Sequence, residues 1–213
     1  MTIDYLIISK QKQQNLLLLA LFSFMLVAFR IIATQRVFYG FLIFNLILAI
    51  VPFIIAFVWL TTPRLHNNKL LLLLGTAGWL LFLPNAPYIV TDFLHFKKES
   101  AMPEWFDVLM LTSFSCSGLA FGFTSLQTMQ QLWEIKFGKR LAEICIFAGC
   151  LLSGLGVYIG RFLRYNSWDV LHKPFALIAD LPPLLFELKA IGFSIGYGVF
   201  FFLFYRIFKS NQR

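Results

Sequence analysis

Charged residues are scarce in this chain. Asp, Glu, Lys and Arg make up 13% of its 213 residues, hydrophobic residues make up 59%, and the mean hydropathy is +0.77. A soluble domain carries charges at about twice that density to cover its surface. The composition therefore excludes an ordinary soluble globular fold, and it predicts that lipid covers the apolar surface that no single core can bury.

Cysteine is also scarce, and familiar catalytic motifs are absent. Cys116, Cys145 and Cys150 lie inside apolar stretches and form no Cys-x-x-Cys pair, which argues against a disulfide framework or a zinc ribbon. The sequence has no P-loop, His-Glu-x-x-His or Gly-x-Ser-x-Gly motif, so it identifies no nucleotide or other cofactor. Whether the protein is an enzyme stays open on these grounds.

Long apolar stretches fill most of the chain. Six of them come close to the roughly 20 residues that a bilayer core requires. They are residues 15–33, 37–60, 70–88, 105–128, 141–159 and 190–208. We therefore predict an all-α fold, a polytopic transmembrane helical bundle that forms one integral membrane domain over residues 1–213. Pro182 and Pro183 cannot continue a helix, so residues 170–185 are expected to form an interfacial or re-entrant segment before the last span.

The formal net charge of +8 comes from Lys and Arg at the ends of these stretches. More of them lie inside when both termini are inside, which predicts cytoplasmic termini in the cell (cytoplasmic) membrane. The basic residues fit anionic membrane lipids as partners. They form no stripe along a groove, so no nucleic-acid partner is expected.

Glycines four residues apart recur in the last three predicted spans. The pairs are Gly118 and Gly122, Gly156 and Gly160, and Gly192 and Gly196. Small residues at this spacing let two helix backbones approach closely. We expect the C-terminal helices to form a tightly packed core, with the first two spans outside it.

A first polar cluster ends the third predicted span. Pro84 and Pro87 flank Asn85 there, and each proline frees a backbone carbonyl from its helical partner. Asn85 is expected to hydrogen-bond such groups or a ligand, with Tyr88 at the membrane interface. The motif is either a kink that ends the helix or a broken helix that presents backbone oxygens to a substrate or ion.

Two Asp-x-x-His pairs, Asp92 with His95 and Asp169 with His172, follow the third and fifth spans. On a helix this spacing places carboxylate and imidazole on one face. Such pairs are found as ligands in helical metal centres, where a divalent metal would bind. They also suit a general base with its orienting partner. The third interpretation is that each Asp caps a helix and each His is solvated.

Arg161 and Arg164 also lie three residues apart, just after the fifth span. A planar guanidinium suits bidentate contact with phosphate or carboxylate. Ion pairing with Asp92, Asp107 or Asp169 is the first interpretation, and binding of a phospholipid or isoprenoid-phosphate headgroup is the second. Snorkelling of the side chains to the interface is the third.

The third and fifth spans run in the same direction, so both polar clusters are expected at one membrane face, in one polar pocket. The candidate catalytic residues, which are also the candidate metal ligands, are Asp92, His95, Asp169 and His172. The candidate substrate-binding residues are Asn85, Tyr88, Asp107, Arg161, Arg164, Asn166 and Trp168.

The stretches from Leu83 to Asp92 and from Gly160 to Asp169 resemble the signature segments of a known family. It is a family of bacterial multi-pass membrane proteins catalogued as a domain of unknown function, number thirteen sixty-one. The resemblance implies an integral protein of the bacterial cytoplasmic membrane, and it implies no activity.

Three functions are therefore considered. The first is a pocket that binds or processes an anionic, lipid-linked substrate at the bilayer surface. The second is a membrane scaffold or accessory subunit without catalysis. The third is a small transporter, which needs polar residues at the membrane midplane, and the chain offers mainly Asn45, Ser113, Ser115 and Ser117 there.

Overall fold

A computed structural model describes residues 10–96, 101–176, 179–180 and 187–210. Within these ranges the regular elements are all helical, which confirms the predicted all-α fold. In chain order they are α1 (Lys10–Thr34), the 3-10 turn η2 (Phe38–Gly40), α2 (Phe41–Thr61), α3 (Pro63–Asn67), α4 (Lys69–Phe82), α5 (Asn85–Tyr88), the 3-10 helix η3 (Ile89–His95), α6 (Glu104–Phe137), α7 (Lys139–Tyr158), the π-helical turn η4 (Ile159–Leu163), α8 (Asp169–His172) and α10 (Leu188–Ser210). Residues 177–178 and 181–185 of the predicted interfacial segment lie outside the described residues.

In the described part of the chain, six helical stretches are long and apolar enough to cross a membrane, as predicted. They are Lys10–Thr34, Phe38–Thr61, Lys69–His95, Glu104–Phe137, Lys139–Leu163 and Leu188–Ser210. The fourth extends nine residues beyond its predicted end at Thr128, to Phe137. It stops at Gly138, whose φ of 86° lies outside the range that a helix or a side chain with a Cβ readily adopts.

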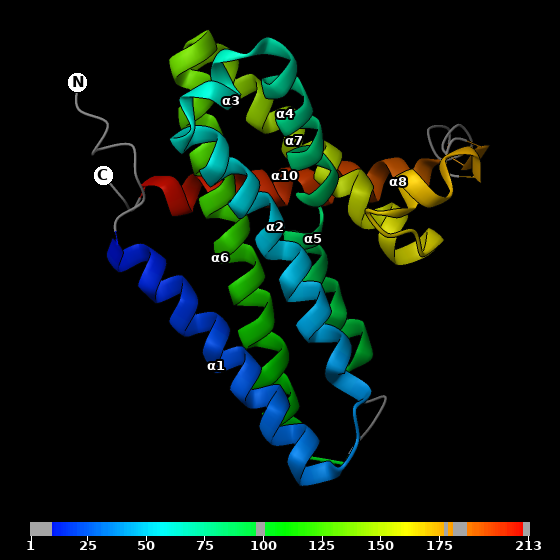
Figure 1. Cartoon of the computed structure of the whole chain (residues 1–213). Helices are drawn as coiled ribbons and strands as arrows, with labels where there is room; N and C mark the ends of the chain where they lie inside the picture. The colour runs from blue at the N-terminus through cyan, green and yellow to red at the C-terminus, as the bar shows by residue number, and fades with distance from the viewer. Residues whose placement is uncertain (1–9, 97–100, 177–178, 181–186, 211–213) are drawn as a thin grey trace.

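Helix α6 is the centre of the molecule (Figure 1). In its apolar stretch 67% of the residues are buried, against 22% to 44% for the other five candidate spans. Helices α1 and α2 pack mainly against α6. On its outer side α1 exposes Leu17, Leu21, Met25 and Phe29, four residues apart, as expected for a stripe that faces lipid.

The two ends of the described chain lie close together (Figure 1). The ammonium group of Lys12, near the start of α1, is 4.8 Å from the ring centroid of Phe208, near the end of α10. An even number of candidate spans agrees with this arrangement, since it returns the chain to the side on which it started.

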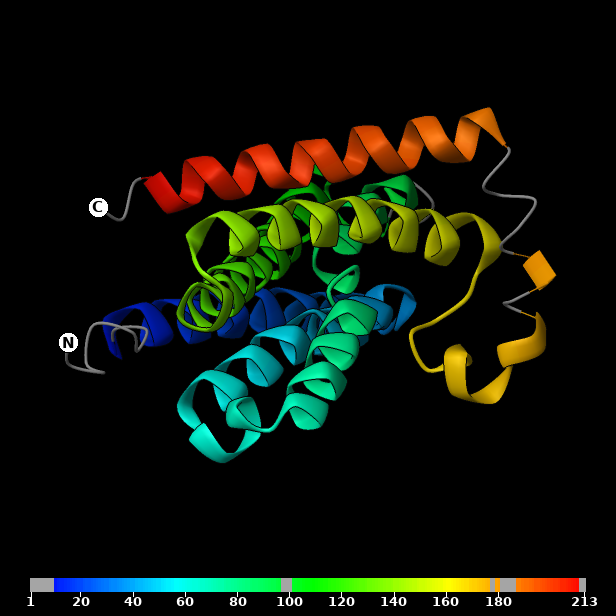
Figure 2. The ribbon, with the colours of Figure 1, turned by 90° about the horizontal axis from the view of Figure 1, so that it is seen from above.

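Helices α7 and α10 pack closely side by side (Figure 2), which agrees with the predicted tight C-terminal core. The glycines at their contact are Gly154 and Gly198. A Cβ at Gly154 would overlap the carbonyl oxygen of Ser194, and one at Gly198 would lie 2.7 Å from Cα of Leu151. The backbones therefore touch where both residues lack side chains.

The predicted role of Gly192 and Gly196 in this contact is wrong. Both are exposed, and a Cβ added at either would meet no atom of the described residues within 4 Å. They occupy another face of α10, because the buried face carries Ser194 and Gly198 instead. Glycine spacing alone does not say which face of a helix meets its neighbour.

The other two glycine pairs pack against the broken end of the third span. A Cβ at Gly118 or Gly122 of α6 would lie 2.8 Å from Ile89 Cδ1 or 2.6 Å from Ala86 Cβ, respectively. Gly156 and Gly160 of the fifth span face Pro84 and Tyr88 in the same way. The Pro84–Tyr88 segment is therefore held between α6 and α7 by two small-residue surfaces.

Replacing Gly154 by Ala should lower stability by about 1–3 kcal/mol, because the new methyl group pushes α7 and α10 apart. The same change at Gly192 is the matched control, since it fills open space and removes a helix-interior glycine, which favours the helix by up to about 1 kcal/mol. Thermal unfolding of the two purified variants in detergent measures the difference. Equal midpoints would contradict the described contact between the helices.

Candidate functional site

Proline chemistry breaks the third span where the two polar clusters meet. Helix α4 ends at Phe82, and the chain continues through α5 into η3. The Asn85 amide donates to the carbonyl of Phe82 at 2.8 Å and to the hydroxyl of Ser167 at 3.0 Å. Ser167 in turn donates to the carbonyl of Leu81 at 3.1 Å. The backbone oxygens at the break are thus satisfied by side chains, one of which comes from the second cluster.

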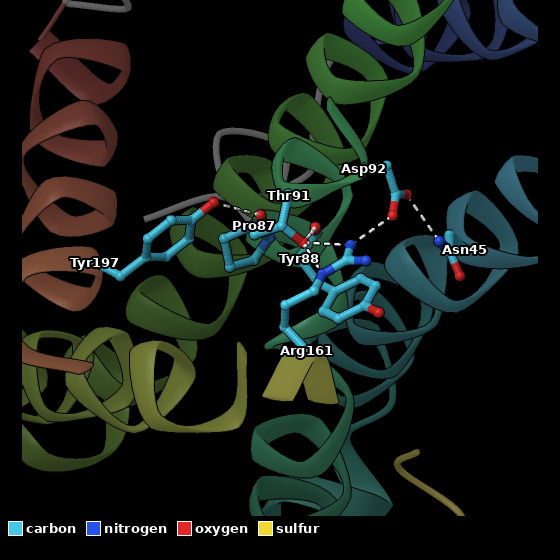
Figure 3. Close-up of polar contacts among 7 residues, drawn as sticks. All are labelled: Asn45, Pro87, Tyr88, Thr91, Asp92, Arg161 and Tyr197. Atoms are coloured by element: carbon cyan, nitrogen blue, oxygen red, sulfur yellow. Dashed lines mark hydrogen bonds and ion pairs between the residues drawn. The ribbon is translucent and has the colours of Figure 1, made fainter. Parts of the chain in front are cut away.

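The fifth span also ends irregularly. Its last turn, η4, is π-helical, and the following Arg164 has a left-handed backbone with φ 61°. Such π turns add a residue within a helix and are frequent at functional sites. Here the turn carries Arg161, whose guanidinium points toward η3 (Figure 3).

A buried ion pair joins the two clusters (Figure 3). The Nη2 of Arg161 is 2.6 Å from Oδ1 of Asp92, and the two side chains are 12% and 1% exposed. The other carboxylate oxygen, Oδ2, accepts a hydrogen bond of 2.8 Å from the Asn45 amide of α2. Of the three interpretations of Arg161, the structure therefore shows the first, an ion pair with Asp92.

The guanidinium of Arg161 has further neighbours that fix its plane. Its Nε donates to the hydroxyl of Thr91 at 2.8 Å, and that hydroxyl donates to the carbonyl of Tyr88 at 2.6 Å. The Tyr88 ring lies below the guanidinium, 4.4 Å from centroid to Cζ. The hydroxyl of Tyr197 on α10 donates to the Pro87 carbonyl at 3.1 Å. Residues of α5 and η3 thus hold the guanidinium, while α10 contacts the adjoining backbone at Pro87.

A polar cavity of about 450 Å³ opens beside Arg161. Its lining is Tyr88, Leu94, His95, Gly160, Arg161, Arg164 and Asn166. Two guanidinium groups and one imidazole line it, and no carboxylate of a described residue does. Arg164 is exposed and makes no ion pair with any described residue. The cavity is therefore positively charged.

A second cavity of about 270 Å³ adjoins the first and is mainly apolar. It shares Tyr88, Gly160 and Asn166 with the polar cavity. Its apolar lining comes from α2, α4, α7 and the segment after η4, and includes Leu48, Leu80, Leu81, Leu152, Leu155, Ile159 and Val170. Tyr165 lies at its edge and donates to Asp180 at 2.8 Å, a hydrogen bond that raises the pKa of the Tyr165 phenol.

Asp107 lies elsewhere than predicted. Its carboxylate forms a buried ion pair with Arg30 of α1, with Nε to Oδ1 at 2.8 Å. The Arg30 guanidinium also lies 4.4 Å from the ring centroid of Tyr39, whose hydroxyl donates to the His95 carbonyl at 3.1 Å. Arg30 lies inside the first predicted span, residues 15–33, and an Arg within an apolar run is the sequence signal for such a buried partner.

Asp169, His172 and Trp168 lie in and before α8. Asp169, the first residue of α8, accepts a hydrogen bond of 2.7 Å from the backbone amide of Asn166, three residues earlier, a local bond between side chain and backbone. His172 is exposed and its Nδ1 is 3.1 Å from the carbonyl of Trp168, whose ring packs on Phe44. These contacts tie the chain before α8 to its first turn, and the N-cap residue of α8, Trp168, makes no side-chain capping hydrogen bond.

The four Asp and His candidates do not gather as one group. In the ranges that the structure describes, no three His, Cys, Asp or Glu side chains lie together as metal ligands would. Of the four, Asp92 pairs with Arg161, and His95 lines the polar cavity with its ring 4.9 Å from that of Phe41. The first pair therefore belongs to the site, and the second supports its backbone.

Two buried serines of α6, Ser113 and Ser117, join it to α1. The hydroxyl of Ser23 on α1 lies 2.7 Å from that of Ser113 and 2.9 Å from that of Ser117, and all three residues are buried. Hydroxyl bonds of this kind hold neighbouring membrane helices together. Ser113 and Ser117 therefore form hydrogen bonds within the protein.

Six candidate spans with α6 at their centre, joined by ion pairs, fit a helical multi-pass membrane protein. The family described as "Protein of unknown function (DUF1361)" matches residues 44–204, most of the chain, and the protein belongs to this family. The match covers the whole Arg161 site, and α1 lies outside it. No curated protein and no solved structure matches the chain significantly.

Replacing Asp92 by Leu should cost about 3–5 kcal/mol, because it leaves the Arg161 guanidinium buried without its counter-charge. Replacing Asp92 by Leu and Arg161 by Met together should recover most of that loss. Equilibrium unfolding of both single variants and the double variant in detergent gives the coupling energy. If the loss in the double variant equals the sum of the single losses, the ion pair described here is absent.

The pair of Arg30 and Asp107 should be purely structural. Arg30→Met with Asp107→Leu is expected to unfold within about 1 kcal/mol of the native chain, since an apolar pair of similar size can replace a buried ion pair. Its retention of anionic lipid should also be unchanged, measured by mass spectrometry of the purified protein. Loss of lipid without loss of stability would place Asp107 in the site, as the sequence predicted.

Proposed function

We propose that the cavity around Arg161 and Arg164 binds the anionic headgroup of a lipid or lipid-linked substrate. The observation that carries this proposal is the lining of the cavity, to which the described residues contribute two guanidinium groups and no carboxylate. Arginine suits phosphate because its planar fork donates two parallel hydrogen bonds. Phosphate is therefore the headgroup chemistry that we expect.

Arg161 and Arg164 have different roles in this proposal. Asp92, Thr91 and Tyr88 hold Arg161, so it is preorganised and loses little side-chain freedom when a ligand binds. Its Nη1 has no hydrogen-bond partner among the described residues and is available to a ligand oxygen. Arg164 has no carboxylate partner among the residues that the structure describes, so its positive charge, unlike that of Arg161, is not neutralised by Asp92.

The neighbouring apolar cavity suits the hydrocarbon part of the same ligand. The two cavities meet at Tyr88, Gly160 and Asn166. A charged compartment joined to one walled by Leu and Ile side chains fits an amphiphile better than it fits a free ion. This junction favours a phospholipid or isoprenoid phosphate over a soluble anion.

The location that goes with this function is the cytoplasmic membrane, with both termini in the cytoplasm. Under that orientation the Arg161 cavity belongs to the outer membrane face. The distribution of Lys and Arg between loops supports it. A scaffold without a ligand is the alternative that follows if the cavity binds no lipid.

Replacing Arg164 by Gln should weaken binding of phosphatidylglycerol about tenfold, the effect of losing one charge-assisted hydrogen bond worth about 1.4 kcal/mol. Arg164 has no ion-pair partner among the described residues, so its loss should leave the unfolding midpoint unchanged. The readout is site-specific: in a chain with Cys116→Ser, Cys145→Ser and Cys150→Ala, Leu94, which lines the cavity, is replaced by Cys. Added lipid should slow the labelling of this single thiol by a soluble maleimide.

Arg140→Gln is the matched control, because it removes an exposed Arg at the other end of the same span. Phosphatidylcholine with the same acyl chains controls for charge. If neither lipid slows the labelling of the Leu94→Cys variant, the proposed function is rejected. The role of the two arginines would be rejected if both lipids slowed the labelling equally. It would also be rejected if phosphatidylglycerol slowed the labelling equally in the Arg164→Gln and Arg140→Gln variants.

A further inference from the structure

A larger cavity lies at the opposite end of the third span. Helix α4 packs mainly on α2, and α7 packs mainly on α10, so α4 and α7 meet only sparsely. Between them, beside the last turns of α6, is a cavity of about 800 Å³. It lies toward Lys69, where the span begins, whereas the Arg161 cavity lies toward His95, where the span ends.

The body of this cavity is apolar. Leu72, Leu73 and Leu80 line it from α4, Trp133 and Phe137 from α6, and Ala148, Gly149 and Leu152 from α7. Leu73 is 64% exposed, as expected for a wall that lipid reaches from the side. Surfaces of this kind hold hydrocarbon chains through burial of apolar area.

The rim at the Lys69 end is basic. Lys69, Lys136 and His66 line it, and the cavity has no carboxylate from the described ranges in its wall. Lys136 donates to the Asn67 side chain, which holds its ammonium group at the rim. The nearest acidic residue along α6, Glu134, pairs instead with Lys209, with 3.7 Å between nitrogen and oxygen. Long lysine side chains at the end of a span reach anionic headgroups.

We propose that this cavity, which we call the α4–α7 groove, is a second lipid site that binds an anionic phospholipid in the leaflet opposite to the Arg161 cavity. An acyl chain lies against Leu72, Leu73 and Leu152, and the phosphate lies between Lys69 and Lys136. The inference goes beyond the function proposed above, since it concerns other residues at the other end of the span.

The groove also continues toward the first site. Leu80 and Leu152 line both the groove and the apolar cavity beside Arg161. Basic residues therefore lie at both ends of one apolar seam between α4 and α7. That pattern, basic ends and a hydrocarbon middle, matches two lipids with headgroups at opposite faces and chains that meet between the helices.

Cys145 is a native reporter for this site, because it lines the groove and is partly exposed. In a chain with Cys116→Ser and Cys150→Ala, phosphatidylglycerol should slow labelling of Cys145 by a small thiol reagent. Lys69→Gln with Lys136→Gln should shift the lipid concentration needed for half of that protection at least tenfold upward. Phosphatidylcholine and soluble glycerol phosphate should protect weakly or not at all.

Arg64→Gln with Lys139→Gln is the charge-matched control, since it removes two exposed basic residues near the same end that do not line the groove. The inference would be overturned if neither pair of substitutions altered the protection of Cys145. It would also be overturned if phosphatidylcholine protected Cys145 equally well. Protection by glycerol phosphate alone would show a soluble anion site instead. The labelling assay on the Leu94→Cys variant reports on the Arg161 cavity alone, so failure of one site is distinguishable from failure of the other.

Discussion

The site depends on the ion pair between Arg161 and Asp92, which joins the end of the fifth span to the end of the third. A single charge at this depth is costly, and two charges are stable there only when they are paired and otherwise hydrogen-bonded. Asn45 and Thr91 supply those remaining bonds. The pair thereby fixes the register of the third span against the fifth and leaves Arg161 at the edge of a positively charged cavity.

Proline and glycine let the helices approach this pair. Pro84 and Pro87 interrupt the third span, and the glycines of α6 and α7 leave room for the interrupted segment on both sides. Side chains from both clusters then satisfy the backbone groups at the break. Helices α4 and α7 make few contacts with each other, and the α4–α7 groove between them provides the apolar surface that lipid can occupy.

Much of the fold follows from the sequence, because span length and hydropathy depend on local composition. The meeting of the two polar clusters follows from counting spans. Other features do not. Gly192 and Gly196 show that spacing cannot say which helix face meets a neighbour, and the partner of Asp107 was missed because Arg30 lies 77 residues away in the chain. The π turn that carries Arg161 has no sequence signature at all.

The most direct test of the account is whether the two polar clusters touch in a membrane. With the native cysteines replaced, Asn85→Cys and Ser167→Cys should form a disulfide under mild oxidation, because the native side chains lie 3.0 Å apart. Asn85→Cys with Ser210→Cys is the control and should not cross-link. If the Asn85–Ser167 pair also fails to cross-link while both cysteines react with thiol reagents, the clusters lie apart and the site does not exist.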